Sequence, residues 1–363
     1  MIRHLYIHIP FCHRICPYCG FYKHLPGRAD YPGFVQALVR ELAWAAERWQ
    51  ILPETVSAGG GTPSLLPARV WTGFAQELRQ RVDLTAVREW TVEANPRTFN
   101  ADKARAWRES GVTRVSLGVQ SFDEGVLQTL GRDHGAADAE RGFEVLRRAG
   151  FADVNVDLMF AVPGQTLASW ADTLDRALSL RPSHVSAYNL TYEEDTDFLR
   201  KLEAGAWSQD ADRDAGYFVL AHEKLTGAGF AHYEVSNYAQ PGFRSVHNQA
   251  YWRGEDYLGL GPSAVSTIQG VRFTNWRDTA EYRRQVAVVG HGRVEEEAVS
   301  EEDRRLERLA LGLRTREGIP ADVADADRVA LLEGEGLAER DGDRLRLTLR
   351  GMMVADDVAG YLI

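Results

Sequence analysis

The chain has 363 residues, of which 44% are apolar, so it is long enough for one large domain and a smaller one with buried cores. Its 42 Lys and Arg against 52 Asp and Glu give a net charge of -10, which disfavours nucleic acid as a partner because a phosphate backbone would repel it. No apolar run approaches the roughly 18 residues that a membrane-spanning helix needs, and no secretion signal is visible, so we expect a cytoplasmic protein.

Short apolar or β-rich runs alternate with amphipathic runs through the first half of the chain. The former predict strands at residues 4–9, 55–60, 89–95, 114–120, 153–160 and 184–191, and the latter predict helices at 31–49, 68–82, 100–111, 136–150 and 166–180. This alternation is typical of parallel strands joined by right-handed crossovers, in a barrel or a doubly wound sheet. In a barrel, the functional groups gather at the carboxyl ends of the strands.

All the cysteines of the chain, Cys12, Cys16 and Cys19, lie in the loop after the first predicted strand. Their odd number and the expected reducing compartment argue against a disulfide framework. Thiolates at CxxxCxxC spacing can converge on one soft metal centre. A closed zinc site would need a fourth ligand, for which His13 and His24 are the candidates. The other interpretation is a 4Fe-4S cluster that has one iron without a protein ligand, where a small molecule can bind and receive an electron.

Polar and glycine residues lie at or near the carboxyl ends of the later predicted strands, which would form the mouth of a barrel. They are Gly60, Gly61 and Thr62 after the second strand, Glu93 in the third, Gln120 and then Arg132 after the fourth, and Asp157 in the fifth. Each alone is more often an ordinary turn or strand-end residue. Their joint placement favours a binding site.

The motifs YIHIPFCHRICPYCGF, GGGTPSLL, EANP, SLGVQSF, LGRDH and NVDLMFAVPGQT occur in this order. Together they resemble the radical S-adenosylmethionine (SAM) superfamily, in the branch of oxygen-independent coproporphyrinogen III oxidase and its relatives. The resemblance spans roughly residues 3–260. It implies an α/β fold with a partial (β/α)6 barrel, a 4Fe-4S cluster on the cysteines, and SAM chelating the open iron through its amino and carboxylate groups.

Several residues then become candidates for SAM binding. Glu93 suits a hydrogen bond from the ammonium group or the ribose, Gln120 and Asp157 suit the ribose hydroxyls, and Arg132 suits the carboxylate. A Cβ at Gly60 would block the approach of the SAM amino group.

Gly61 and Thr62 are candidates for the same close approach of the backbone to the SAM amino group, although a tight strand-to-helix turn would need glycine too. Tyr18 is expected to pack against adenine or to cover the cluster. The resemblance places Tyr6 as a cap on the cluster pocket, and core packing in the first strand is the alternative for it.

A departure from the oxidase pattern and a further motif move the assignment within this branch. Phe21 occupies the position at which the oxidases carry a further cysteine, and HNQAYW at residues 247–252 is similar to the HNxxYW signature of the HemW-type heme chaperones. His247 is therefore the candidate heme ligand, with Tyr251 and Trp252 packing on the porphyrin. The alternative is that His247 ties down a loop.

We expect three parts: residues 1–235 as the barrel with cluster and SAM, 236–299 as a connecting region with the HNxxYW motif, and 300–363 as a smaller C-terminal α+β domain. The last part has two amphipathic runs and a short β-like run, an order that resembles a winged helix. Acidic residues and arginines alternate there and leave no basic face, so we favour a lid or partner-docking module over a DNA reader.

The expected function is that of a heme chaperone with a SAM-coordinated 4Fe-4S cluster. Heme would be its cargo and heme-accepting proteins, respiratory ones among them, its partners, reached through transient contact with a membrane. One alternative is the enzyme, an oxygen-independent coproporphyrinogen III oxidase. A second is a metal-sensing or partner-binding module.

Overall fold

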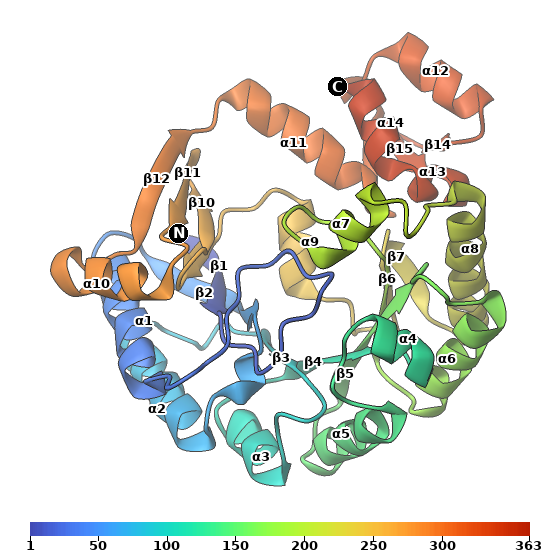
Figure 1. Ribbon diagram of the computed structural model, residues 1–363. Helices are drawn as coiled ribbons and strands as arrows, with labels where there is room; N and C mark the ends of the chain where they lie inside the picture. The colour runs from blue at the N-terminus through green and yellow to red at the C-terminus, as the bar shows by residue number, and fades with distance from the viewer.

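The computed structural model describes residues 1–363 and contains a curved nine-stranded sheet (Figure 1). The strand order is β7-β8-β6-β5-β4-β3-β2-β1-β9, and the central six strands are parallel. These six are β1 (Ile2–Ile9), β2 (Ile51–Gly60), β3 (Glu89–Ala94), β4 (Arg114–Gln120), β5 (Asp153–Phe160) and β6 (His184–Asn189). The α/β class and the partial (β/α)6 barrel are confirmed, and each strand lies within four residues of its predicted bounds.

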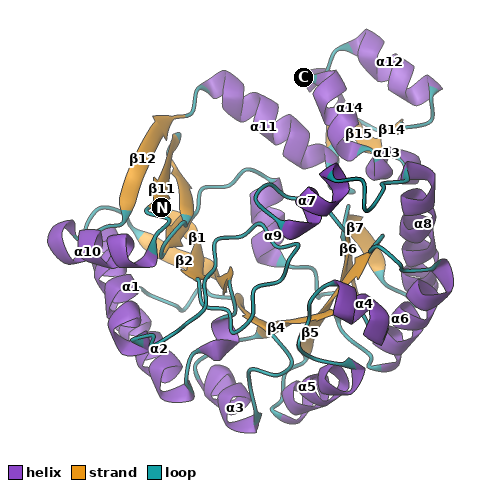
Figure 2. Cartoon of the chain, in the orientation of Figure 1, coloured by secondary structure: helices purple, strands orange, loops and turns teal.

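Crossover helices form an outer ring around the strands (Figure 2). They are α1 (Tyr31–Ala46), α2 (Ala68–Arg81), α3 (Ala101–Glu109), α5 (Ala136–Arg148) and α6 (Leu167–Ser179), each within three residues of prediction. In α6, Thr166 caps the first turn by accepting from the Ser169 N–H at 3.1 Å, and Trp170, Leu174 and Ala177 bury one face. The short helices η1 (Pro63–Leu65) and α4 (Glu124–Thr129) were not predicted.

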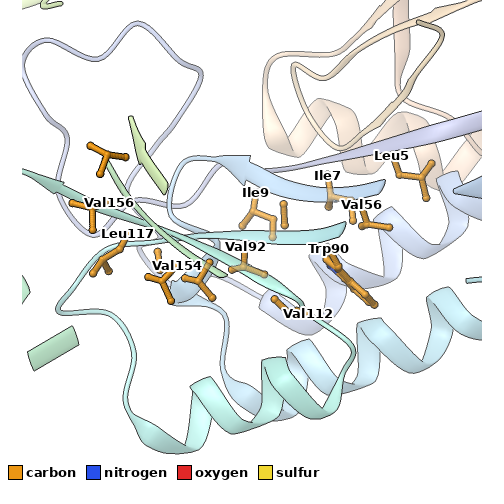
Figure 3. Packing of buried hydrophobic residues seen from close by; sticks show 14 of the residues in the cluster. Leu5, Ile7, Ile9, Val56, Trp90, Val92, Val112, Leu117, Val154 and Val156 are labelled. Atoms are coloured by element: carbon orange, nitrogen blue, oxygen red, sulfur yellow. The ribbon is translucent and has the colours of Figure 1, made fainter. Parts of the chain in front are cut away.

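Successive side chains of the parallel strands point alternately to the helices and to the barrel interior. Figure 3 shows outward residues of several strands packed in one core, among them Ile7, Val92, Leu117 and Val156. Burying such side chains stabilises the fold by about 1.5–3 kcal/mol each. The inward positions carry polar side chains instead, which are Thr91, Glu93, Ser116, Asn155, Asp157 and Ser186. The outer face therefore holds the barrel together and the inner face is free to build a site.

Later segments extend both edges of the sheet. β8 (Asn237–Ala239) pairs antiparallel with β6 and with β7 (Ala231–Glu234), and β9 (Leu258–Leu260) pairs parallel with β1. The predicted connecting region at 236–299 thus contributes two strands to the barrel sheet, and the β7–β8 pairing crosses the predicted boundary at 235. The three-part division stays a prediction.

The remaining elements of the middle region were not predicted individually. They are α7 (Asp197–Glu203), α8 (Ala211–Gly227), α9 (Val246–Trp252), α10 (Thr279–Val289), and a separate three-stranded antiparallel sheet of β10 (Val265–Ile268), β11 (Val271–Asn275) and β12 (Arg293–Ala298). α9 is the element that matters for the site, because it lies against the first residues of β3 and the middle of β2.

The C-terminal segment follows the order expected of a winged helix. It contains α11 (Glu301–Leu313), β13 (Ile319–Pro320), η2 (Ala321–Val323), α12 (Ala326–Gly334), β14 (Ala338–Asp341) and β15 (Arg344–Leu347), with sheet order β13-β15-β14. Two further helices, α13 (Leu349–Met353) and α14 (Ala355–Leu362), follow the hairpin. Across the whole chain, no helix combines the length and the apolar character that crossing a membrane requires.

Glu41 on α1 joins the first helix to elements that lie more than 200 residues later. Its fully buried carboxylate accepts hydrogen bonds from the Gly261 N–H at 2.9 Å, Asn275 Nδ2 at 2.8 Å, the Gly292 N–H at 3.0 Å and the Tyr282 hydroxyl at 2.7 Å. Burial raises the pKa of Glu41 and these donors oppose that rise. No arginine or lysine pairs with it, so neutral donors alone hold the charge.

We expect the Glu41→Ala substitution to lower the free energy of unfolding by about 3 kcal/mol or more, because it leaves several buried donors without an acceptor. Tyr282→Phe removes a single donor and should cost about 1 kcal/mol. Chemical denaturation followed by circular dichroism measures both. An unchanged midpoint for Glu41→Ala would show that α10 and β11 are held by apolar packing alone.

Candidate functional site

The cysteine loop leaves β1 and is closed at its base by backbone hydrogen bonds. The Cys12 N–H donates to the His24 carbonyl and the His24 N–H to the Pro10 carbonyl, both at 2.9 Å. Cys12 is 8% exposed, whereas Cys16 and Cys19 are half-buried. The loop therefore returns to its starting point and presents its thiols on one side of a fixed base.

The glycine segment at the end of β2 runs beside this loop. The Gly61 N–H donates to the Ile9 carbonyl at 2.9 Å and the Thr62 N–H to the Phe11 carbonyl at 2.8 Å. A Cβ on Gly61 would lie 2.7 Å from the Pro10 carbonyl carbon, and Gly60 has φ +100°, a conformation that favours glycine. The close approach to Pro10 explains Gly61, and the positive φ with the adjacent His8 ring explains Gly60. A contact of either glycine with SAM stays a prediction.

Two adjoining cavities open on the loop. The smaller, of about 80 Å³, is lined by the three cysteines, by residues 60–62 and by Arg132. The larger, of about 470 Å³, continues into the barrel interior and contains Glu93, Gln120 and Asp157 in its wall. Tyr18, Cys19, Gly60 and Gly61 line both cavities. The thiols and the polar interior of the barrel therefore share one boundary.

The side chains of Glu93 and Asp157 line the larger cavity, and the charge of Asp157 affects the pKa of Glu93. Glu93 accepts only from the Gly60 N–H at 3.3 Å, and burial, reinforced by the negative charge of Asp157, raises the pKa of Glu93 to about 7. Asp157 accepts from Ser116 Oγ at 2.8 Å and from Asn155 Nδ2 at 2.7 Å. Burial also raises the pKa of Asp157, against these hydrogen bonds. A bound cation would relieve both groups.

Arg132 lies between the cysteine loop and the barrel. Its Nη1 donates to Cys16 Sγ at 3.5 Å and its Nη2 to the Gly118 carbonyl at 2.8 Å, while its Nε is buried without a partner. Thr62 Oγ1 donates to Cys12 Sγ at 3.3 Å. These donors approach two of the thiols, and they would stabilise the charge of thiolates.

The other candidates from the sequence differ in how close they lie to the cavities. Gln120 reaches the large cavity from a strained backbone with φ 68°. Tyr18 lies against Phe198, with ring centroids 5.9 Å apart. Tyr6 is not part of either cavity wall, and its hydroxyl is 3.0 Å from Nδ1 of His8. A contact between Tyr6 and SAM stays a prediction.

His247 lies on α9 at the inner end of the large cavity and is 3% exposed. Its Nδ1 is 2.7 Å from Thr55 Oγ1 and its Nε2 is 3.0 Å from the Tyr251 hydroxyl, so both ring nitrogens are engaged. The His247 N–H donates to Glu89 at 3.0 Å. Burial and nearby His4 lower the pKa of His247 to about 3, which keeps the ring neutral. Iron ligation would require one of the ring contacts to open, and it stays a prediction.

The donor set fits a cluster together with SAM. The three thiols that line one cavity suit an iron-sulfur group. The two carboxylates with raised pKa values suit a cationic ligand, and the arginine with an unpartnered Nε suits a carboxylate. A zinc site would lack a free fourth ligand at His24, because its two ring nitrogens are hydrogen-bonded to the Leu25 carbonyl and to Thr279. His13 is paired with Asp133.

No group of three or more His, Cys, Asp or Glu side chains converges closely enough to bind one metal ion. Thiolates around one zinc would stand about 3.8 Å apart, given Zn–S bonds of about 2.3 Å in a tetrahedron. In a cube-shaped cluster each thiolate binds its own iron, which places the sulfurs further apart. Metal analysis separates the two cases.

Sequence reasoning missed most of the inner wall of the barrel. Ser57, Thr91, Arg114, Asn155 and Ser186 all line the large cavity. The signal that could have found them is the alternation of polar residues within the predicted strands, since positions two apart share a face. It was overlooked because buried parallel strands are expected to be apolar on both faces.

Comparisons with known proteins agree with this architecture. The family model of the radical SAM superfamily matches residues 6–177, and that of the HemN C-terminal domain matches residues 299–354. Among solved structures, coproporphyrinogen III oxidase (HemN) from Escherichia coli has a TM-score of 0.87 at 23% identity, over 99% of this chain and 90% of that one. At that identity the likeness establishes the fold.

Several similar curated sequences carry the name "Heme chaperone HemW". The Lactococcus lactis protein is 31% identical over 97% of this chain and 95% of its own length, and the Bacillus subtilis protein is 31% identical over 100% and 99%. The Escherichia coli protein is 40% identical over 73% of this chain and 70% of its own. Given identity of this order along almost the full length, the chain belongs to the HemW family of radical SAM proteins.

Proposed function

We propose that this protein binds heme and transfers it to acceptor proteins, and that it carries a 4Fe-4S cluster with SAM at the barrel mouth. The observation that carries the proposal is the similarity to proteins named heme chaperones, at 31% identity along almost the full length and 40% over 73% of the chain. The geometry supports the cofactor part, because the thiols and the carboxylates border the same pair of cavities.

Membership of the superfamily implies a 4Fe-4S cluster and SAM. Cys12, Cys16 and Cys19 would hold the cluster, with Thr62 and Arg132 donating toward two of the sulfurs. When bound, such a cluster supplies single electrons to a molecule on its open iron.

The inner wall would orient SAM. Glu93 has one weak partner, the Gly60 N–H, and so has capacity to accept from the amino group of SAM. Gln120 and Asp157 would bond the ribose, and Arg132 would use its unpartnered Nε for the carboxylate. Tyr18 would cover the ligand where the two cavities meet.

Heme would bind near α9, with His247 as the axial candidate. A neutral imidazole is the form that ligates iron, and burial keeps His247 neutral. For this role Nδ1 would leave Thr55 or Nε2 would leave Tyr251.

The C-terminal domain would dock the acceptor, including acceptors reached by transient membrane contact. Its surface exposes Val323, Leu331, Val354 and Tyr361, each between 37% and 53%. These apolar side chains stand among charges of both signs, as at Arg328 and Asp327. A surface of this kind suits a protein partner better than nucleic acid.

Anaerobic reconstitution should load about four iron and four sulfide per chain in the wild type. Each of Cys12→Ser, Cys16→Ser and Cys19→Ser should lose most of this content, since the chain has no other thiol to substitute. Chemical analysis of iron, sulfide and zinc provides the measurement. His13→Ala is the control and should keep its cluster; one tightly held zinc per chain that is lost in His13→Ala would refute the cluster assignment.

SAM affinity should depend on the ionisation of Glu93. With a pKa of about 7 in the free protein, Glu93 is ionised at pH 8 and mostly protonated at pH 6, so SAM should bind about tenfold more weakly at pH 6. Equilibrium dialysis of the reconstituted protein measures the affinity at each pH. Glu93→Gln should bind weakly at both pH values; a variant that keeps the wild-type pH profile would remove Glu93 from the SAM site.

Heme titration should show about one heme per chain, and His247→Ala should weaken binding at least tenfold if the imidazole ligates iron. The matched control is Thr55→Val, which releases the same ring nitrogen but keeps the ring. Ligation predicts that Thr55→Val binds heme as well as the wild type does. Equal losses in the two variants would mean that His247 only holds the loop, and rapid turnover of coproporphyrinogen III by the holoprotein would favour the oxidase instead.

A further inference from the structure

One row of inward side chains, directly above the Thr55–Glu89 pair, is polar and reaches the large cavity. Ser57 on β2, Thr91 on β3 and Arg114 on β4 are direct neighbours in register, and all three line the cavity wall. Closed (β/α) barrels fill these positions with bulky aliphatic side chains. Here the cavity extends below the row of Glu93 and Ser116 to the floor that α9 covers.

Arg114 brings a positive charge to this floor and is only 3% exposed. Its Nη1 donates to Asp153 Oδ1 at 2.8 Å and to the Phe243 carbonyl at 3.4 Å, and its other nitrogens make no hydrogen bond within the chain. A guanidinium has five N–H donors and stays charged when it is buried. The Nε and Nη2 groups of Arg114 therefore remain free to donate to a ligand in the cavity.

Thr91 provides an independent observation. It is 8% exposed, and its hydroxyl is buried without any hydrogen-bond partner. An unsatisfied buried hydroxyl costs about 1–3 kcal/mol, so such groups usually await a ligand or water. The side chains of Ser57 and Asn248 border the same floor and also make no side-chain hydrogen bond within the chain.

We propose that the floor of the barrel cavity binds the carboxylate group of a small organic acid. Arg114 would be the charged donor, with Thr91 and Asn248 as neutral donors. Arg114 is already paired with Asp153 and lies in the field of Glu89, so the site offers its remaining N–H groups and the neutral donors. A planar carboxylate matches two N–H groups of a guanidinium. None of the residues that we assign to SAM belongs to this row, so the two ligands would occupy different levels of the barrel.

The carboxylate has two chemical sources, a free acid or the propionate side chain of heme. The first arm of the test titrates the reconstituted protein with sodium propionate against sodium chloride at matched ionic strength, and follows binding by calorimetry and by the shift in melting temperature. We expect saturable binding in the millimolar range, weakened about tenfold or more in Arg114→Gln and about threefold in Thr91→Val.

Thr91→Val is the variant in which misfolding cannot imitate the result, because Arg114→Gln also removes the ion pair with Asp153. Thr91→Val removes a hydroxyl that has no partner, so the melting temperature of the free protein should stay equal or rise. Arg88→Gln is the matched control, because Arg88 pairs with Glu54 outside the cavity and is 57% exposed. It should bind propionate as the wild type does.

The second arm compares heme with heme dimethyl ester, whose carboxylates are blocked. If a propionate of heme reaches the floor, the ester binds more weakly than heme to the wild type, and this preference disappears in Arg114→Gln. This arm rests on the proposed heme binding: absence of any heme binding counts against that function, whereas heme binding with no preference over the ester counts against this source alone. Absence of propionate binding together with absence of an ester effect overturns the carboxylate site.

Discussion

The period of two along the parallel strands is the constraint on which the rest of the structure depends. On β3, Trp90 and Val92 pack against the helices while Thr91 and Glu93 point inward. A slip of one residue in the register would expose the apolar set to the cavity and bury the charges among the helices. The burial of the outer face is what allows the inner face to remain polar.

The interior groups shift each other's ionisation because so many polar atoms share a small volume. The negative charge of Asp157 raises the pKa of Glu93, and Arg132 and Arg114 lie near the upper and the lower end of the interior. Within this interior Glu93 has a single weak hydrogen-bond partner, whereas Arg114 is already paired with Asp153.

Local patterns were sufficient to predict the parallel strands and their helices, because each is long and has a clear period. The cysteines and GGGT could be placed at one mouth from topology alone. The sequence did not reveal β8, β9 or α9, which are three to seven residues long and are defined by distant partners such as Glu89 and Thr55. The engagement of both His247 nitrogens is likewise a tertiary property, since Thr55 lies 192 positions away.

The pairing of β1 with β9 has a consequence for how the chain is made. The first strand to leave the ribosome acquires its outer neighbour only when Leu258 to Leu260 have emerged, some 250 residues later. Until then the nascent barrel carries an open strand edge, which is the kind of surface that joins other chains. A truncated translation product that ends after β6 would keep this edge of β1 exposed and would therefore be prone to aggregation.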